Sequence, residues 1–385
     1  MCTSRVLSIA ISATRRWSLA VALMLIATSV QAGTVETVAG RFDGPISFHA
    51  DGVKVGEKQV AIGEVLYLYA DPAQKVATGK AQPIKSLVRL RTGEVWIGPI
   101  AGASSKEVKV TNGWFGKKAF SLKQVSVLDF MPHEPITVAE KRKTLYRKPG
   151  KPLPGAIVWI DKKSLGLDSP LGTVTLRRQG LVRYVMDNKP APVVTNEKAQ
   201  DEVGLADGNV FRGQIEMKDG EIIFTHPVGG RATFPAKIVS YIIRHTPAMV
   251  ELSALPHEKI KAEHVGLAKG TQLAMLGRST AKCVRSVRLE PKIAIRYALP
   301  ARDGKKLVLR ATLAPVAPAR GDAQIKFSVG GRTVLQKVIS ASDSRVPVEI
   351  VLPEGKELTI DVDFGPLLRF PCGAVLQDAH LVLVK

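Results

Sequence analysis

A pattern of turn glycines and short apolar segments occurs four times before residue 247, and this repetition constrains the fold more than any other feature. In the clearest copy, 203–243, turns separate about five short segments rich in β-branched residues. Such segments alternate apolar and polar residues, as expected for strands with one buried face. Earlier copies cover about 156–186, 87–130 and 40–68. We therefore expect repeated units of about five strands.

Three copies keep an apolar residue four positions after a turn glycine. The pairs are Gly116 with Phe120, Gly172 with Leu176, and Gly230 with Phe234. A constant interval preserves the register of a strand that buries one face. A unit this short has little core, so it must close into a small barrel or lend its edge to a neighbour. Over about 35–247 the pattern resembles the small Sm-like or SH3-like barrels.

Beyond about Pro247 the predicted strands lengthen. We expect eight of them, at 284–289, 293–298, 307–313, 323–329, 333–339, 346–352, 357–364 and 380–384. Turn residues lie between them, at Asp303-Gly304, Gly330-Gly331 and Glu354-Gly355. This pattern predicts an antiparallel β-sandwich. A weak helical pattern precedes it at 258–269.

The order of these strands resembles the NPCBM family, a carbohydrate-binding module found beside glycoside hydrolases of family 98. The matching stretches are IAIRYAL (293–299), KLVLRATLA (306–314), IKFSVGGRTVL (325–335), ELTIDV (357–362) and LQDAHL (376–381). The resemblance covers about 255–385. It implies a galactose-binding-like jelly-roll sandwich that holds sugar in loops at one end. The closing run departs from the family, which has a Trp near the end where this chain has Leu376.

Four residues of this segment are candidate ligand-binding residues. Arg296 and Tyr297 are adjacent in a strand, so one of the two side chains faces inward. Of the residues typical of the family's closing run, this chain has only the aspartate, Asp378. Together with His380 it has the spacing of one strand face, which fits either ligand contact or structural polar contact. Sugar binding needs an aromatic face and a few fixed polar groups.

The N-terminus has the features of a secretory signal. Arg15 and Arg16 precede an apolar run, and Val30-Gln31-Ala32 supplies small residues for cleavage after Ala32. We expect export to the periplasm or the extracellular space, with no membrane span left after cleavage; an uncleaved anchor is the alternative. In an oxidising compartment, Cys283 and Cys372 are a candidate disulfide, the alternative being two buried thiols.

The net charge is +21, or +18 once the three arginines of the signal are removed. Lys and Arg outnumber Asp and Glu by 18 to 11 over 33–150, 13 to 10 over 151–247 and 21 to 13 over 248–385. The excess is therefore spread along the chain, which fits either contact with anionic surfaces or a solvated surface. The densest run, from Lys141 to Lys148, falls in 132–154, which we expect to be a linker, as is 187–202.

No sequence motif indicates catalysis. The seven histidines lack close metal-ligand spacing, so we expect no metal and no cofactor. Trp96, Trp114 and Trp159 favour a core role over a stacking platform, and nucleic acid is not an expected partner. Asp361 and Asp363 alternate on one strand, which leaves a polysaccharide hydrolase as a minor alternative.

The sequence therefore predicts an all-β chain in four parts. These are a signal peptide (1–32), two small barrel-like repeats (33–150), two further repeats (151–247) and a jelly-roll sandwich (255–385). The predicted function is non-catalytic binding of a glycan by the sandwich. The alternative is an envelope scaffold whose repeats bind another exported protein by pairing of strand edges.

Overall fold

The computed structural model describes most of the chain. The described residues are 31–50, 52–70, 86–132, 140–186, 200–218, 220–262, 275–277, 285–289, 291–316, 320–366 and 372–385. The predicted signal segment up to residue 30 and Cys283 lie outside them. Within these ranges no helix has the length and apolar character needed to cross a membrane.

Unit 1 comprises residues 31–70. Its elements are β1 (Gln31–Glu36), β2 (Arg41–Phe48), β3 (Gly52–Val55), β4 (Lys58–Ala61), the 3-10 turn η2 (Ile62–Glu64) and β5 (Tyr67–Ala70). β1 pairs with both β5 and β2, β2 pairs with β3, and β3 pairs with β4, all antiparallel. The chain thus turns back on itself four times, and the last strand returns to lie beside the first.

The same pairing order recurs in unit 4, and units 2 and 3 differ only in that their second strand is divided into two strands of different sheets. Unit 2 (86–132) has β6 (Leu87–Leu90), β7 (Val95–Ile97), β8 (Ile100–Ser104), β9 (Glu107–Asn112), β10 (Gly116–Ser121), η3 (Leu122–Gln124) and β11 (Val125–Asp129). Unit 3 (140–186) has β12 (Thr144–Arg147), β13 (Leu153–Pro154), β14 (Ala156–Ile160), β15 (Ser164–Ser169), β16 (Gly172–Arg177) and β17 (Leu181–Val185). Unit 4 (200–245) has β18 (Gln200–Leu205), β19 (Val210–Lys218), β20 (Glu221–His226), β21 (Gly230–Pro235), η4 (Ala236–Ile238) and β22 (Val239–His245).

The recurring glycines have the backbone role that the sequence assigns to them. Gly116, Gly172 and Gly230 have φ values of 70°, 97° and 80°, a region that glycine adopts without steric cost. Each starts a strand that buries the residue four positions on, fully for Phe120 and Phe234. The predicted fold class, all-β with barrel-like repeats followed by an antiparallel sandwich, is confirmed.

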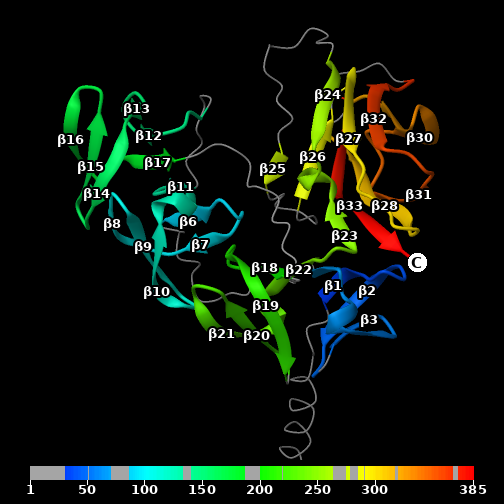
Figure 1. Cartoon of the computed structure of the whole chain (residues 1–385), viewed down its shortest axis with the longest axis horizontal. Coiled ribbons are helices and arrows are strands. Elements are labelled where there is room, and N and C mark those ends of the chain that lie inside the picture. The colour runs from blue at the N-terminus through cyan, green and yellow to red at the C-terminus, as the bar shows by residue number, and fades with distance from the viewer. Residues whose placement is uncertain are drawn as a thin grey trace, which may run out of the picture.

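Pairing between units does not follow their order in the sequence. The last strands of units 1 and 4 pair, β5 with β22, and so do the last strands of units 2 and 3, β11 with β17. β7 and β19 then join units 2 and 4 at Val95 and Val210. The units therefore follow an arc in the order 3, 2, 4, 1, as Figure 1 shows.

The prediction of a linker over 132–154 is wrong for its second half. Residues 144–147 form β12, the first strand of unit 3, and β13 follows at 153–154. β12 pairs with β17 and buries Leu145 and Tyr146. Prolines and lysines hid this strand in the sequence, because its apolar part is only two residues long. The predicted linker over 187–202 ends at β18, which begins at Gln200.

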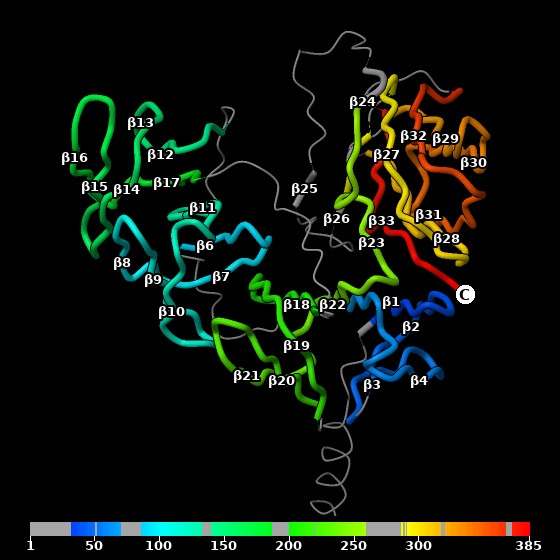
Figure 2. The backbone as a smooth tube through the Cα atoms, viewed as in Figure 1, coloured from blue at the N-terminus to red at the C-terminus, as the bar shows by residue number. Residues whose placement is uncertain are grey.

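The sandwich, residues 249–385, consists of two antiparallel sheets. The first, here called sheet D, has the order β25 (Met275–Gly277), β26 (Arg285–Leu289), β33 (Ala374–Val384), β28 (Lys306–Pro315), β31 (Val346–Leu352), with β23 (Met249–Glu251) also on β33. The second, sheet E, has the order β24 (His257–Ala262), β27 (Ile293–Ala298), β32 (Glu357–Phe364), β29 (Ala323–Val329), β30 (Arg332–Ile339). The tube in Figure 2 follows the chain through both sheets.

The expected helix at 258–269 is wrong over its described part. β24 covers 257–262 and pairs with β27, from His257 opposite Tyr297 to Ala262 opposite Ile293. A free sheet edge offers each backbone group of the segment a partner, and this outweighs a weak helical pattern.

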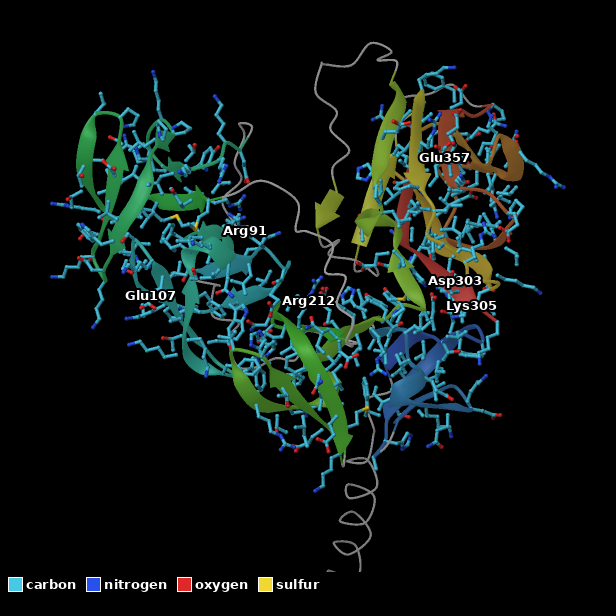
Figure 3. All side chains as sticks on the ribbon, in the orientation of Figure 1. Arg91, Glu107, Arg212, Asp303, Lys305 and Glu357 are labelled. Carbon is cyan, nitrogen blue, oxygen red and sulfur yellow. The ribbon has the colours of Figure 1, made fainter. Side chains whose placement is uncertain are left out.

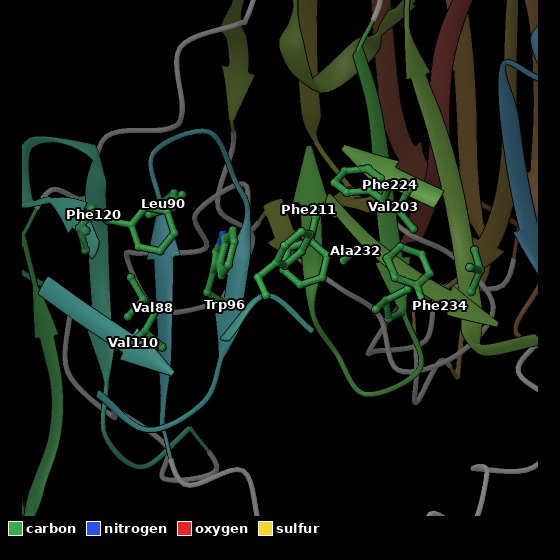
Figure 4. Packing of buried hydrophobic residues seen from close by; sticks show 14 of the residues in the cluster. Val88, Leu90, Trp96, Val110, Phe120, Val203, Phe211, Phe224, Ala232 and Phe234 are labelled. Carbon is green, nitrogen blue, oxygen red and sulfur yellow. The ribbon is translucent and has the colours of Figure 1, made fainter. Parts of the chain in front are cut away.

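Separate apolar clusters stabilise the parts and their junction. Trp96 lies at the contact of units 2 and 4, with its ring centroid 5.0 Å from that of Phe211 (Figure 4). The sandwich has a core of its own. A central cluster joins units 1, 2 and 4 to the sandwich, and consists of Leu66, Tyr67, Val95, Val210, Tyr241, Ile243, Met249 and Val382. The sandwich is thus packed onto the units.

Candidate functional site

A hollow lies where sheet D meets unit 1, and its lining is mostly polar. The residues around it are Thr34, Glu36, Arg41, Tyr67, Tyr69, Ala311, Thr312, Arg345 and Asp378. Five of these come from β1, β2 and β5, and four come from the sandwich, so neither part forms the site alone.

A bulge in β33 places Asp378 at this hollow. Arg310 of β28 lies opposite His380 and Thr312 lies opposite Gln377, so Asp378 and Ala379 together face the single residue Ala311. Asp378 has φ 48°, a left-handed conformation that is uncommon for a residue with a side chain, although aspartate tolerates it better than most. Bulges re-aim side chains and are over-represented next to functional sites.

Arginines from both parts meet at the hollow. Arg345 Nε donates to Oε1 of Gln377 at 2.9 Å, next to the bulge. Arg41 Nη1 donates to Oγ1 of Thr312 at 3.3 Å, and the same guanidinium forms an ion pair with Asp43 at 3.2 Å. With Glu36 and Asp378 the lining carries two positive and two negative groups. It is therefore close to neutral.

A buried ion pair lies beneath the hollow. His380 Nδ1 is 2.7 Å from the carbonyl oxygen of Asp378, and Nε2 is 2.8 Å from Oε2 of Glu36. Both partners are acceptors, so both ring nitrogens donate and the ring is an imidazolium. Burial disfavours this charge, but Glu36 outweighs it and raises the pKa of His380. The pKa of Glu36 is lowered, because His380, Arg41 and Arg310 outweigh its desolvation.

Two tyrosines of β5 complete the lining. Tyr67 is buried and its ring lies parallel to that of His380, with centroids 6.0 Å apart and 21° between the planes. Tyr69 is two residues further along the strand, hence on the same face, and is only half-buried. It lies opposite Thr34 of β1. Tyr69 is therefore the aromatic side chain that a ligand in the hollow would meet.

The four predicted ligand-binding residues fall into two separate places. Asp378 lines the hollow, and His380 lies beneath it in the ion pair with Glu36. Arg296 and Tyr297 are in β27 of the opposite sheet. Arg296 forms ion pairs there with Glu258 at 2.8 Å and Glu357 at 3.5 Å.

Tyr297 faces the core of the sandwich. Its side chain is 2% exposed, and burial raises its pKa to about 12. Its neighbour Arg296 is the one that points outward, as the alternation of side chains in a strand requires.

Sequence reasoning missed Tyr69, Arg41 and Arg345. The Tyr67-Leu68-Tyr69 triplet was a usable signal, since it places two aromatic rings on one face of a strand. The two arginines had no such signal, because nothing in the sequence shows that unit 1 and sheet D are neighbours. Arg41 and Thr312 are 271 residues apart.

Other residues that the sequence analysis singled out are buried or bonded to neighbouring side chains. Trp96 is fully buried, and Trp114 donates from Nε1 to Oδ2 of Asp207 at 2.9 Å. Asp363 forms an ion pair with Lys292 at 2.9 Å. Cys372 is buried, and its predicted partner is outside the described residues. Within the described ranges no group of three His, Cys, Asp or Glu side chains is arranged to hold a metal ion.

Comparison with known proteins adds neighbours of low similarity. No protein-family model and no curated protein matches the chain. Among solved structures, a CBM51 module from Clostridium perfringens GH95 in complex with methyl-galactose aligns over 35% of this chain and 99% of its own, at 14% identity and TM-score 0.28. The tandem CBM51 modules of the family 98 glycoside hydrolase from Streptococcus pneumoniae SP3-BS71 align over 64% and 89%, at 10% identity and TM-score 0.27.

Proposed function

We propose that this protein binds a neutral carbohydrate in the hollow between the sandwich and unit 1. The observation that carries the proposal is the bulge that places Asp378, with its left-handed backbone, in a hollow that Arg345 and Tyr69 also line. A strained residue at the mouth of a hollow is a recognised mark of a functional site. Asp378 and Arg345 would form hydrogen bonds with sugar hydroxyl groups, and the ring of Tyr69 would stack on a C–H face of the sugar.

The charge of the lining favours a neutral ligand. Arg41, Arg345 and the imidazolium of His380 are balanced in number by Glu36, Asp43 and Asp378, so an isolated ion would gain little from the hollow. A sugar, by contrast, presents donors and acceptors together, which is what Thr34, Asp378 and Arg345 offer. The buried ion pair of Glu36 and His380 would hold the two walls at a fixed distance.

The proposal includes an exported, non-catalytic protein, and it agrees with what the NPCBM resemblance of 255–385 implies. It differs from the resemblance in one respect, because it moves the sugar site from the loops of the sandwich to its contact with unit 1. Arg296 and Tyr297 have no part in it. In this view Asp378 is a ligand-binding residue and His380 a positioning residue.

A scaffold role is the second candidate function. In the described part of the chain β4 pairs with β3 alone and ends the large sheet, so it has one open edge. An exported protein could add a strand there. This role does not need the hollow.

A glycan array on the full chain tests the proposal, followed by titration of the best sugar into three variants. Asp378→Asn keeps the backbone preference and is expected to weaken binding by about tenfold, the cost of a hydrogen bond to a charged group. Tyr69→Ala is expected to have a similar effect through lost stacking. The matched control is Asp361→Asn, a half-buried aspartate of β32 in the other sheet.

The outcomes separate the two functions. Loss of binding in Asp378→Asn and Tyr69→Ala with unchanged Asp361→Asn supports the sugar site. Absence of any array signal for the unaltered protein favours the scaffold. Equal binding by all three variants would place the sugar elsewhere.

A further inference from the structure

Most of the net positive charge of the four units is in unit 3. Counted over its 140–186 range, this unit has 11 Lys and Arg against 3 Asp and Glu. The same count is 7 against 3 in unit 2, 3 against 5 in unit 1 and 5 against 6 in unit 4. A division of the sequence at residue 150 splits this unit and hides its charge.

Three loops of unit 3 bring seven of these basic residues to one end. The backbone N–H of Lys148, after β12, donates to the carbonyl of Gly180, before β17, at 2.8 Å. The N–H of Arg178 donates to the carbonyl of Lys163, in the turn between β14 and β15, also at 2.8 Å. The loops 147–151, 161–163 and 177–180 are therefore neighbours. We call this end of the unit the basic loop face.

The basic side chains of this face are mostly in solvent. Lys151, Lys162, Lys163 and Arg177 are exposed. Figure 3 shows nitrogen-tipped side chains extending outward from this unit, at the end of the arc away from the sandwich. The three loops contain one acidic residue, Asp161. Its Oδ1 already accepts hydrogen bonds from the backbone N–H groups of Lys163 and Ser164, at 2.7 Å each.

One arginine fixes the geometry of the face. Arg178 Nη1 donates to the carbonyl of Asp161 at 3.0 Å and to that of Ile100, in β8 of unit 2, at 2.9 Å. It thus ties two of the loops to the neighbouring unit. Arg178 therefore fixes the backbones of the loops that carry the other cations, and the cations are grouped at one end of the unit.

We propose that the basic loop face binds an acidic polysaccharide, a polymer of spaced carboxylates. A polyanion is attracted by several cations at once, and lysines on flexible stems can adjust to the spacing of its carboxylates. This site is independent of the proposed sugar hollow, which lies at the other end of the arc (Figure 1).

Other polyanions fit the face less well. Nucleic-acid binding grooves stack bases on aromatic rings, and the three loops contain no Phe, Trp or Tyr. Stable attachment to a membrane needs apolar side chains next to the cations. Two large apolar residues of this unit are exposed. Leu171, 93% exposed, is in the turn after β15, and β15 begins at the basic end, so Leu171 lies at the opposite end. Val158, 36% exposed, is inside β14 and belongs to none of the three loops.

The test is a titration of polygalacturonate into the purified protein at several NaCl concentrations. The loop variant replaces one exposed cation in each loop, as Lys151→Gln, Lys163→Gln and Arg177→Gln together. The matched control, Lys141→Gln, Arg142→Gln and Lys143→Gln together, removes the same charge from the other end of β12. A conservative variant, Lys151→Arg, Lys163→Arg and Arg177→Lys together, keeps the charge.

We expect salt-sensitive binding that falls by about tenfold in the loop variant, since each exposed contact contributes modestly, and by less than about twofold in the control. The conservative variant should bind like the unaltered protein, and Asp378→Asn should have no effect. Equal loss in the loop and control variants would overturn the proposal, because net charge alone would then explain binding. Absence of binding, or tighter binding to duplex DNA or to phosphatidylglycerol vesicles, would overturn it as well.

Discussion

Nε2 of His380, in β33, lies 2.8 Å from Oε2 of Glu36, in β1, although 344 residues separate them in the sequence. Both side chains are about 3% exposed. Arg310 donates to the carbonyl of Thr37 at 2.7 Å beside them, so three buried polar groups fix the sandwich on unit 1. This contact defines one wall of the hollow.

The first prediction concerns pH. His380 has a raised pKa, so its contribution to stability is complete below its ordinary value of 6.5 and is lost as pH rises through the folded value. Glu36 has a lowered pKa, so its contribution is present above 4.5 and is lost as pH falls through the folded value. The melting temperature should therefore be highest between about pH 4.5 and 6.5. Thermal melts across pH 3–9 check this, and Glu36→Gln should flatten the alkaline side of the profile.

The second prediction concerns the loss of one partner. Glu36→Gln leaves the imidazole of His380 buried without its counter-charge, which should lower the free energy of unfolding by roughly 3 kcal/mol. The matched control is Glu216→Gln, whose carboxylate is 67% exposed and pairs with Arg231 on the surface of unit 4. That change should cost less than about 1 kcal/mol. Urea unfolding measures both, and equal small losses would show that the buried pair does not stabilise the junction.

The third prediction separates stability from binding at one residue. Asp378 has φ 48°, where glycine has no steric penalty, so Asp378→Gly should raise the free energy of unfolding by about 0.5–1 kcal/mol. The same change removes the carboxylate and should weaken sugar binding by at least about tenfold. Calorimetric melting and sugar titration on one sample check both parts. A variant that is destabilised and binds normally would argue against strain retained for function.

The fourth prediction concerns the repeat core. Phe234 is fully buried four residues after a turn glycine, and Phe234→Ala should cost about 3–5 kcal/mol. Leu171, at the corresponding turn of unit 3, is 93% exposed, and Leu171→Ala should change stability by less than about 0.5 kcal/mol. Chemical unfolding followed by tryptophan fluorescence distinguishes the two.

Local features of the fold were predictable from the sequence. Turn glycines, alternation and β-branched residues were enough to place β27, β29, β31 and β32 at their observed bounds. β12 was missed because its apolar part is two residues long, and β24 was assigned to a helix because only its pairing with β27 makes it a strand.

The candidate site was predictable only in part. Asp378 was predicted because the NPCBM family has an aspartate at that place, and His380 because it has the spacing of the same strand face. What surrounds the two side chains depends on unit 1. Glu36, Arg41 and Tyr69 reach the site because β5 pairs with β22 and the sandwich packs on both. Contacts between parts far apart in the chain leave no periodic signal. The basic loop face was hidden for a related reason, since a division of the chain at residue 150 separates its charges.

The most direct test of the proposed function is a crystal structure of the full chain soaked with the sugar that binds best on the array. The proposal predicts density for a sugar ring against Tyr69, with hydroxyl groups bonded to Asp378 and Arg345. Density for the sugar at the loops of the sandwich, near Arg296, or anywhere else outside the hollow, would contradict it.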